Sequence, residues 1–280
     1  MSGPLAAWLL GVSPAGAPPD RLAAAVRGRL VVVTGASRGV GRELAVRLAA
    51  TGAQVVGLAR TEEPLAALRE RAARAGRRFD YLVCDLRETD AAAAAAGDVL
   101  ERWGVPAIHV AAAGHSIHRR LDQYVDRFHD VLRTAGANYL GPAAFAAPLA
   151  HAMARAGEGH VIGVSTTSVD LPGPAWSAYE ASKAAFDVWL GALAPELARS
   201  GVAVTSVHLP RVATAMSAPT AGRYPVPELT CAQAASLLGR AIVERPRLIA
   251  PWWARLGGAV WRLQPALPDA AWSRLPERWW

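Results

Sequence analysis

The sequence is poor in cysteine and in long apolar runs. Two cysteines, Cys84 and Cys231, are too few for a disulfide framework, and neither has a partner at metal-ligand spacing. They favour a reducing, cytoplasmic setting and no metal site. The apolar run from Leu5 to Val12 follows no basic segment, is broken by Gly11 and Pro14, and falls short of the roughly 20 residues that cross a bilayer. We therefore expect neither a secretion signal nor a transmembrane span.

The remaining composition is that of a globular protein. With 280 residues, of which 52% are hydrophobic and 19% charged, the chain is too apolar for a disordered protein and too varied for a fibrous one. The length suits one large domain with a well-buried core. The net charge of +7 is compatible with nucleic acid, an anionic membrane surface or a phosphorylated small molecule, and does not choose among them.

From Leu30 onward, short β-branched runs alternate with longer helical patterns, which is typical of parallel strands joined by crossover helices. Runs such as Leu30 to Val33 are apolar on both faces, so helices should cover both sides of the sheet. We predict an α/β fold, a doubly wound parallel sheet in a Rossmann-type three-layer sandwich that forms a single domain. Strands are expected near 30–34, 54–59, 79–84, 107–111, 160–165, 202–208 and 247–250, and helices near 40–51, 63–75, 88–103, 121–156 (broken around Gly136 and Pro142), 178–199 and 231–243.

Three segments are distinguished by composition. Residues 1–28 form a Pro/Ala/Gly-rich lead-in with a short helix from Pro19 to Val26 that we expect to dock on the domain. Residues 29–251 carry the strand and helix alternation and form the predicted catalytic domain. Residues 252–280 form a tail rich in tryptophan and arginine.

A glycine-rich segment from Thr34 to Gly41, TGASRGVG, joins the first strand to the next helix. Glycines at 35, 39 and 41 allow a tight turn and close backbone approach, while the helix start offers free N–H groups to a pyrophosphate. The pattern predicts a dinucleotide site, and its alternative is a turn without a ligand. The second strand runs into Arg60 rather than the carboxylate that binds an unmodified ribose. Arg38 and Arg60 would suit a 2′-phosphate, which favours NADP(H); otherwise both are solvated surface charges.

Tyr179 and Lys183 stand one turn apart at the start of a predicted helix. A tyrosine with a free pKa of about 10 is a poor acid or base at neutral pH, and a nearby ammonium would lower that pKa. Lys183 is the only lysine among 30 basic residues, which suggests that this position requires an ammonium. The pair is predicted to act as an acid/base in proton transfer. The alternative is an ordinary surface contact.

With these motifs in this order, the sequence from about Leu30 to Pro251 resembles the short-chain dehydrogenase/reductase family. The resemblance implies catalytic roles for Tyr179 and Lys183, and for Asn138, which would support a water relay behind the lysine. It also implies that Thr214 binds the nicotinamide carboxamide and that Asp85 follows the third strand as in the family. The implied cofactor site comprises Gly35, Ser37, Arg38, Gly39, Val40, Gly41, Arg60, Asp85, Leu86, Ala112, Gly114, Tyr179, Lys183, Pro210, Val212 and Thr214.

The chain departs from the family at three points. Thr166 stands where the catalytic serine usually lies, with Ser165 before it, and either hydroxyl could donate to a substrate carbonyl. Residues 111–114 read Ala-Ala-Ala-Gly in place of Asn-Asn-Ala-Gly. Arg211 follows Pro210 where the family has glycine, which places a cation near the nicotinamide pocket. His115 and His118 are expected to be loop residues, with the edge of the pocket as the alternative.

Within the family, the sequence looks like the reductase portion of bacterial fatty-acyl reductases. This likeness implies an NADPH-dependent oxidoreductase that converts a lipophilic aldehyde or ketone to an alcohol. The family also implies a homo-oligomer, a dimer or tetramer paired through the helices near 121–156 and 178–199. The alternative function is a dinucleotide-binding sensor or partner subunit without turnover, which the three departures would suit.

Six of the ten tryptophans lie between Trp252 and Trp280, and residues 245–280 hold six arginines against two acidic residues. Aromatic rings interleaved with arginines favour peripheral contact with a membrane interface. The alternative is that Trp252, Trp253 and Trp261 cover the substrate pocket or a subunit interface. No basic groove motif indicates nucleic acid.

Overall fold

Seven parallel strands form one sheet in the computed structural model, which describes residues 11–13, 15–220 and 227–274. Their order across the sheet is β3-β2-β1-β4-β5-β6-β7, so the direction of winding reverses between β1 and β4. In such sheets, ligands bind beyond the carboxyl ends of the strands at the reversal. The strands are β1 Leu30–Thr34, β2 Gln54–Ala59, β3 Phe79–Val83, β4 Ile108–Ala111, β5 Gly159–Thr166, β6 Val202–Leu209 and β7 Leu248–Ile249.

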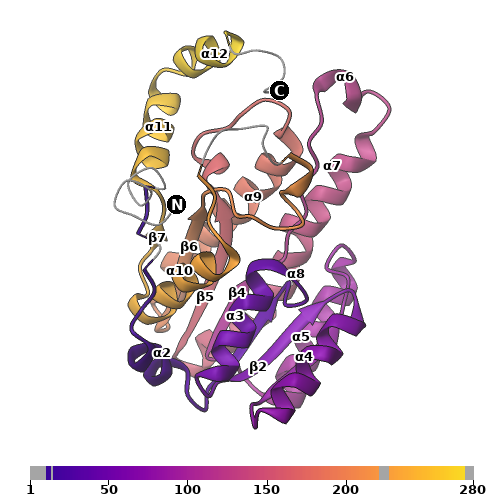
Figure 1. Ribbon diagram of the computed structural model, residues 1–280, viewed down its shortest axis with the longest axis vertical. Helices are drawn as coiled ribbons and strands as arrows, with labels where there is room; N and C mark the ends of the chain where they lie inside the picture. Colours follow the sequence, from indigo (N-terminus) through magenta and orange to yellow (C-terminus); the bar gives the residue numbers. More distant parts are fainter. Residues whose placement is uncertain (1–10, 14, 221–226, 275–280) are drawn as a thin grey trace.

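Helices cover both faces of the sheet (Figure 1). The helices α3, α4 and α10 pack on one face, with the short α2 against α10, whereas α5, α8 and α9 pack on the other. Their bounds are α2 Pro19–Val26, α3 Gly39–Ala50, α4 Glu62–Arg74, α5 Thr89–Trp103, α8 Gly141–Ala156, α9 Ser177–Ala198 and α10 Cys231–Glu244. The predicted doubly wound fold is confirmed.

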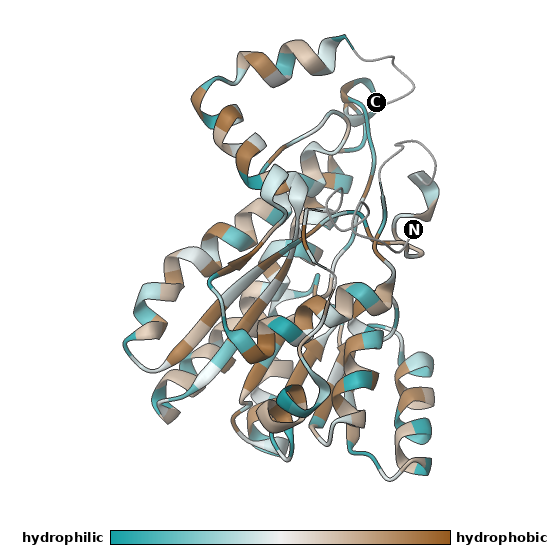
Figure 2. Ribbon diagram, turned by 60° about the vertical axis from the view of Figure 1, so that its left-hand side comes forward, coloured by the Kyte–Doolittle hydropathy of each residue, from teal (hydrophilic) through white to brown (hydrophobic). Residues whose placement is uncertain are grey.

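Alternating side chains of β1 show why the sheet is covered twice. Val31 and Val33 point into the core shared with α3 and α10, while Val32 points into the core shared with α5 and α8, and all three are fully buried. Consecutive strand residues face opposite sides of the sheet, so a continuous apolar run demands two apolar partners. Figure 2 shows hydrophobic residues concentrated in the strands.

The long region predicted as a broken helix divides into shorter elements, α6 Leu121–Tyr124, α7 Phe128–Ala135, the π-helical turn η1 Gly136–Leu140 and α8. The predicted break at Gly136 is where α7 passes into η1, and Pro142 follows η1 in the first turn of α8. Gly141 packs directly under the loop after β3, because a Cβ there would collide with the carbonyl of Leu86.

The tryptophan- and arginine-rich tail forms two further helices, α11 Trp252–Leu263 and α12 Ala266–Ser273. The start of α11 joins the lead-in, since the Trp252 N–H donates to the Gly11 carbonyl at 3.0 Å. The tryptophans at 279 and 280, like residues 1–10 of the lead-in, lie outside the described residues. Across the described ranges, every helix is too short or too polar to cross a membrane.

A buried ion-pair cluster ties β6 to α9 and to the loop after β5. His208 Nδ1 lies 2.6 Å from Asp170 Oδ2, and His208 Nε2 lies 3.1 Å from Asp187 Oδ2 on α9. Burial opposes a charged imidazole, but the hydrogen bonds and charges of the two aspartates outweigh it and raise the pKa of His208 to about 9. The cluster therefore holds a proton at neutral pH.

This proton makes stability depend on pH. A raised pKa contributes its full stabilisation below the unfolded-state value of about 6.5, and the contribution is lost as pH rises through the folded value. We expect the free energy of unfolding to fall between pH 6.5 and 9 by up to about 3 kcal/mol more in the wild type than in His208→Gln. Urea denaturation at both pH values measures this difference, and equal slopes in the two proteins would contradict it.

Candidate active site

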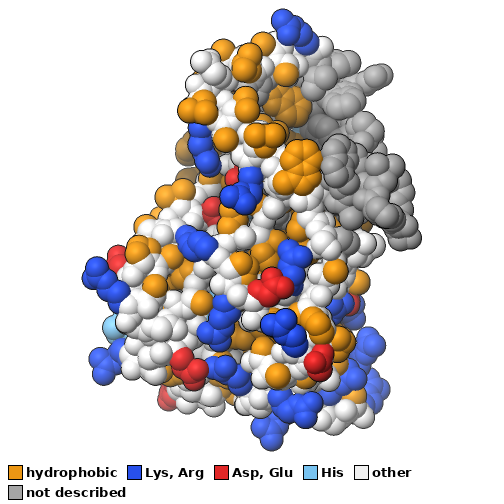
Figure 3. All heavy atoms as spheres, turned by 90° about the vertical axis from the view of Figure 1, so that its left-hand side faces the viewer, with side chains coloured by type: hydrophobic (Ala, Val, Ile, Leu, Met, Phe, Trp, Pro, Cys, Tyr) orange, Lys and Arg blue, Asp and Glu red, His pale blue; other side chains and the backbone are white. Residues whose placement is uncertain are grey.

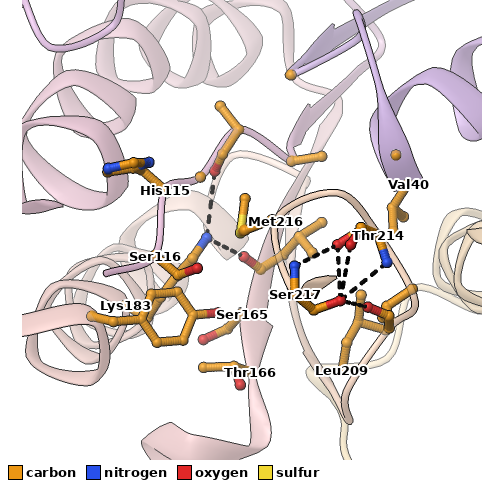
Figure 4. A pocket seen from close by; sticks show the side chains of 18 of the residues that line it. Val40, His115, Ser116, Ser165, Thr166, Lys183, Leu209, Thr214, Met216 and Ser217 are labelled. Atoms are coloured by element: carbon orange, nitrogen blue, oxygen red, sulfur yellow. Dashed lines mark hydrogen bonds between the residues drawn. The ribbon is translucent and has the colours of Figure 1, made fainter. Parts of the chain in front are cut away.

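A cavity of about 1350 Å³ opens at the carboxyl ends of the central strands. The sequence-predicted site residues all line it except Asn138, which lies behind its wall. Figure 4 shows Lys183, Ser165 and Thr166 on one side of this space and Val40 and Thr214 on the other. The described residues contain no group of three or more His, Cys, Asp or Glu side chains that could hold a metal ion.

The glycine-rich segment is shaped for close contact with a ligand. Gly35 and Gly39 have φ of +72° and +59°, which side chains other than hydrogen rarely allow. A Cβ on Gly35 would lie 2.9 Å from the backbone of Ala113, and one on Gly41 would collide with the Gly35 carbonyl. Arg38 directly precedes α3, so the free N–H groups of that helix start at the cavity wall. This cradle fits a dinucleotide pyrophosphate.

The charges near the cradle are arginines. Arg38 and Arg60 both line the cavity, and Thr61 follows Arg60 where a carboxylate would otherwise bind a ribose. Asp85 is already engaged, since Arg87 Nε donates to its Oδ2 at 3.0 Å, and this hydrogen bond holds the pKa of Asp85 below its usual range. Sequence reasoning missed Arg87. Arg87 stands two residues after the predicted site residue Asp85, and this spacing was the signal that the sequence offered.

Tyr179 and Lys183 both reach the cavity from the first two turns of α9. The Lys183 ammonium donates to the carbonyls of Val164, at 3.0 Å, and Ala113, at 3.4 Å. Burial lowers the pKa of Lys183 to about 8 and raises the pKa of Tyr179 to about 12, although a hydrogen bond with Thr166 acts against the latter shift. The sequence argument expected the ammonium to lower the tyrosine pKa. In the protein alone, desolvation of the phenolate has the largest effect on the pKa of Tyr179.

Two hydroxyls stand beside the tyrosine at the end of β5. Ser165 Oγ is buried in the cavity wall and has no hydrogen-bond partner among the described residues. Thr166 Oγ1 is engaged with Ser168, accepting from its backbone N–H at 3.3 Å, and with Tyr179. Ser165 Oγ thus has no protein partner and is almost fully covered, whereas the Thr166 hydroxyl contacts the phenol.

Asn138 lies in the π-helical turn η1 and braces the site without lining the cavity. Its Oδ1 accepts from the N–H of His115 at 2.7 Å, and its Nδ2 donates to the His115 carbonyl at 2.8 Å and to Ser182 Oγ at 2.9 Å. Asn138 thus couples the loop after β4 to α9, the helix that carries Tyr179 and Lys183. The two predicted loop histidines differ in place, because His115 lines the cavity while the His118 ring packs edge-on against Trp176 at 4.9 Å.

The loop after β6 forms the opposite wall. Arg211 does not present a free cation there, because its guanidinium donates to Glu228, to Thr220 Oγ1 at 3.1 Å and to the Ser217 carbonyl at 2.8 Å. It anchors the loop that carries Thr214, which packs beside Gly39 of the glycine-rich segment.

Aromatic residues of the two tail helices close the cavity. Trp252 and Trp253 of α11 line it, as the second interpretation of the tail expected, and Trp272 of α12 takes the place expected for Trp261. Sequence reasoning did not single out Trp272. Its position depends on the turn between α11 and α12, which brings its ring near Gly173.

Comparisons with known sequences point to one family. The profile of the short chain dehydrogenase family matches residues 29–224. The chain is 35% identical over 279 residues to a fatty acyl-CoA reductase of Mycobacterium tuberculosis, covering 99% of this chain and 93% of that one. It is 34% identical over 240 residues to the fatty acyl-CoA reductase of Acinetobacter baylyi, covering 86% and 81%.

Solved structures give the same result. A short-chain dehydrogenase from Streptomyces avermitilis superposes with a TM-score of 0.71 at 25% identity, covering 88% of this chain and 97% of that one. A metagenomic short-chain oxidoreductase in complex with NADP has a TM-score of 0.68 at 27% identity, covering 80% and 97%. Together with the family profile and the identity to full-length relatives, these matches show that the chain belongs to the short-chain dehydrogenase family.

Proposed function

We propose that this protein reduces a lipophilic aldehyde or ketone to an alcohol with NADPH. The observation that carries the proposal is the shared cavity, which brings Tyr179, the hydroxyl residues Ser165 and Thr166 and the pyrophosphate cradle around one space. A proton donor, a carbonyl-binding hydroxyl and a dinucleotide site are the parts that carbonyl reduction needs.

Each residue of the site has its own role in the proposed reaction. When bound, the nicotinamide supplies a hydride to the carbonyl carbon. The hydroxyl of Thr166, which contacts the phenol, or that of Ser165 donates a hydrogen bond to the carbonyl oxygen. Tyr179, which is a neutral phenol because its pKa lies near 12, donates its proton to that oxygen. The Lys183 ammonium, one helical turn away, balances the charge left on the phenolate. Asn138 keeps the loop after β4 and the catalytic helix in register.

The apolar wall of the cavity supports a lipophilic substrate. Trp252, Trp253 and Trp272 line the cavity together with Leu171 and Met216. Burial of an aliphatic chain against such side chains contributes about 25 cal/mol for each Å² of apolar surface removed from water. The likeness to two proteins named fatty acyl-CoA reductases supports the same substrate class.

A panel assay tests the proposal. NADPH oxidation is measured with medium- and long-chain aldehydes, ketones and 3-keto lipids. Turnover that rises with chain length is the expected result. Tight NADPH binding without turnover on any member of the panel would instead favour a dinucleotide-binding sensor.

The preference for NADPH over NADH should depend on Arg38 and Arg60. Replacing both by glutamine removes two charge-assisted hydrogen-bond donors for a 2′-phosphate, so we expect the ratio of kcat/KM for NADPH to that for NADH to fall about 10- to 100-fold. Arg77→Gln changes an arginine on the turn before β3, outside the cavity lining, and is the matched control. An unchanged ratio in the double variant would refute the assignment.

The homo-oligomer implied by the family stays a prediction. Phe128 and Leu132 on α7, exposed by 64% and 62%, and Val188 on α9, exposed by 70%, support pairing through the two regions named from the sequence. Contiguous patches of exposed apolar side chains often mark protein–protein contacts.

A further inference from the structure

The outward face of α11 is apolar, contrary to what solvent contact alone would require. Leu256, Val260 and Leu263 are spaced by four and three residues, so they lie along one side of the helix. Leu267, at the start of α12, is also apolar and exposed. The exposed fractions are 60% for Leu256, 41% for Val260, 80% for Leu263 and 61% for Leu267. A surface helix normally presents its polar side to water, whereas this apolar face is left uncovered by the described part of the chain. We call these four residues the apolar stripe.

The stripe cannot turn inward, because the other side of α11 is fixed. Ala254 and Gly258 are buried against the domain, and a Cβ on Gly258 would lie 2.7 Å from the Asp170 carbonyl. A Cβ on Gly257 would lie 3.3 Å from Leu171. Glycine at both positions lets the helix backbone lie against the loop after β5. Exposure of the stripe is therefore a property of the folded structure.

Positive charge lies beside the stripe. Arg255 and Arg262 are exposed on one edge of α11, where Arg262 also borders a small pocket that contains Asp170 and Asp187. Asp269 is the single acidic residue of α11 and α12. Figure 3 shows hydrophobic side chains gathered over these helices, with cationic side chains beside them. An apolar face edged by arginines complements a bilayer with anionic headgroups.

We propose that the apolar stripe docks α11 and the start of α12 flat on an anionic lipid surface. Leucine side chains enter the boundary between headgroups and acyl chains, while the two arginines meet the lipid phosphates. A second copy of the chain suits the surface less well, since antiparallel two-fold pairing through α11 would bring the arginine edges of both copies together. Like charges at such an interface oppose association.

Docking would place the cavity at the membrane. Trp252 and Trp253 on α11 and Trp272 on α12 line the cavity, so the same two helices present the stripe outward and wall the cavity inward. A lipophilic substrate could then pass from the bilayer to the site without crossing bulk water. This consequence rests on the proposed function, whereas the docking itself does not.

Co-sedimentation of the full chain with vesicles tests the docking. We expect binding to vesicles of phosphatidylcholine with phosphatidylglycerol and much weaker binding to phosphatidylcholine alone. Leu256→Glu with Leu263→Glu should weaken the partition coefficient about tenfold or more, because charge replaces two side chains that enter the lipid. Arg255→Gln with Arg262→Gln should weaken binding to the anionic vesicles and leave binding to neutral vesicles unchanged.

Val105→Glu is the matched control, because Val105 is an exposed apolar residue, at 45%, that precedes β4 at the opposite end of the sheet. It should bind vesicles like the wild type. A wild-type chain that stays in the supernatant with anionic vesicles would overturn the proposal. So would a leucine double variant that binds normally, or one whose mass by light scattering without vesicles is half that of the wild type, which would identify the stripe as a subunit contact.

Two further measurements separate this proposal from the proposed function. The leucine double variant should retain wild-type turnover of a short, water-soluble carbonyl substrate in the absence of vesicles, which also shows that it folds. An inactive wild type that binds anionic vesicles would refute the reductase alone. A wild type that is active but does not bind anionic vesicles would refute the docking alone.

Discussion

Replacing Tyr179 by phenylalanine should lower kcat for carbonyl reduction about 100- to 10,000-fold, the range typical of a lost general acid. The ring and its packing remain, including the edge contact with Trp176 at 5.9 Å, so the change removes the hydroxyl alone. KM should change little, since the phenol acts mainly as the oxygen gains its proton. Steady-state NADPH oxidation with a responsive substrate measures both constants.

Tyr81→Phe provides the control for this experiment. Tyr81 lies on β3, and its hydroxyl bonds to Glu62 at 3.0 Å, outside the cavity lining. This variant should keep wild-type kcat. Fluorescence titration with NADPH should give the same affinity for Tyr179→Phe as for the wild type. If Tyr179→Phe reduced carbonyls at the wild-type rate, another group would have to supply the proton.

Gly141→Ala should lower the free energy of unfolding by about 3 kcal/mol, the upper end of the usual cost of overpacking. The new methyl group would collide with the Leu86 carbonyl, and a backbone oxygen cannot rotate away as a side chain can. Leu86 also lines the cavity, so the displacement should weaken cofactor binding in whatever fraction folds. Urea denaturation followed by circular dichroism gives the stability.

Gly97→Ala is the matched change in another helix. Gly97 is exposed within α5, and nothing lies within 4 Å of a Cβ placed there. Alanine is preferred over glycine inside helices by about 1 kcal/mol, so this variant should be at least as stable as the wild type. Equal stability of the two variants would show that the contact at Gly141 relaxes without cost.

The fold was predictable because its signals are local and repeated. Apolar runs such as Leu30 to Val33 can be satisfied only by a sheet covered on both faces, and each run ends near a turn. The π-helical turn η1 and the small helix α6 were not predicted. Their backbone is set by tertiary contacts, such as the bonds from Asn138 to His115, that no periodicity in the sequence records.

The candidate site was predictable where a motif carries its own chemistry. The glycine-rich segment, Tyr179 and Lys183 meet around one cavity as expected. The hydrogen-bond partners and the burial of each group were harder to predict from the sequence, because they depend on neighbours distant in the chain. Arg211 illustrates this, since it reads as a free cation beside the cavity until Glu228 and Thr220 are seen to hold it. Burial of the Tyr179 phenol likewise could not be read from its spacing to Lys183.

The backbone hydrogen bond between Trp252 and Gly11 joins segments that are 241 positions apart in the chain. Gly11 leaves room for the indole of Trp253, whose other side faces the cavity, so the lead-in supports an aromatic wall of the cavity from behind. The lead-in at Gly11 and the tail helix α11 are therefore not separable appendages. Shortening the protein at its amino terminus would reshape a surface built from its carboxyl terminus.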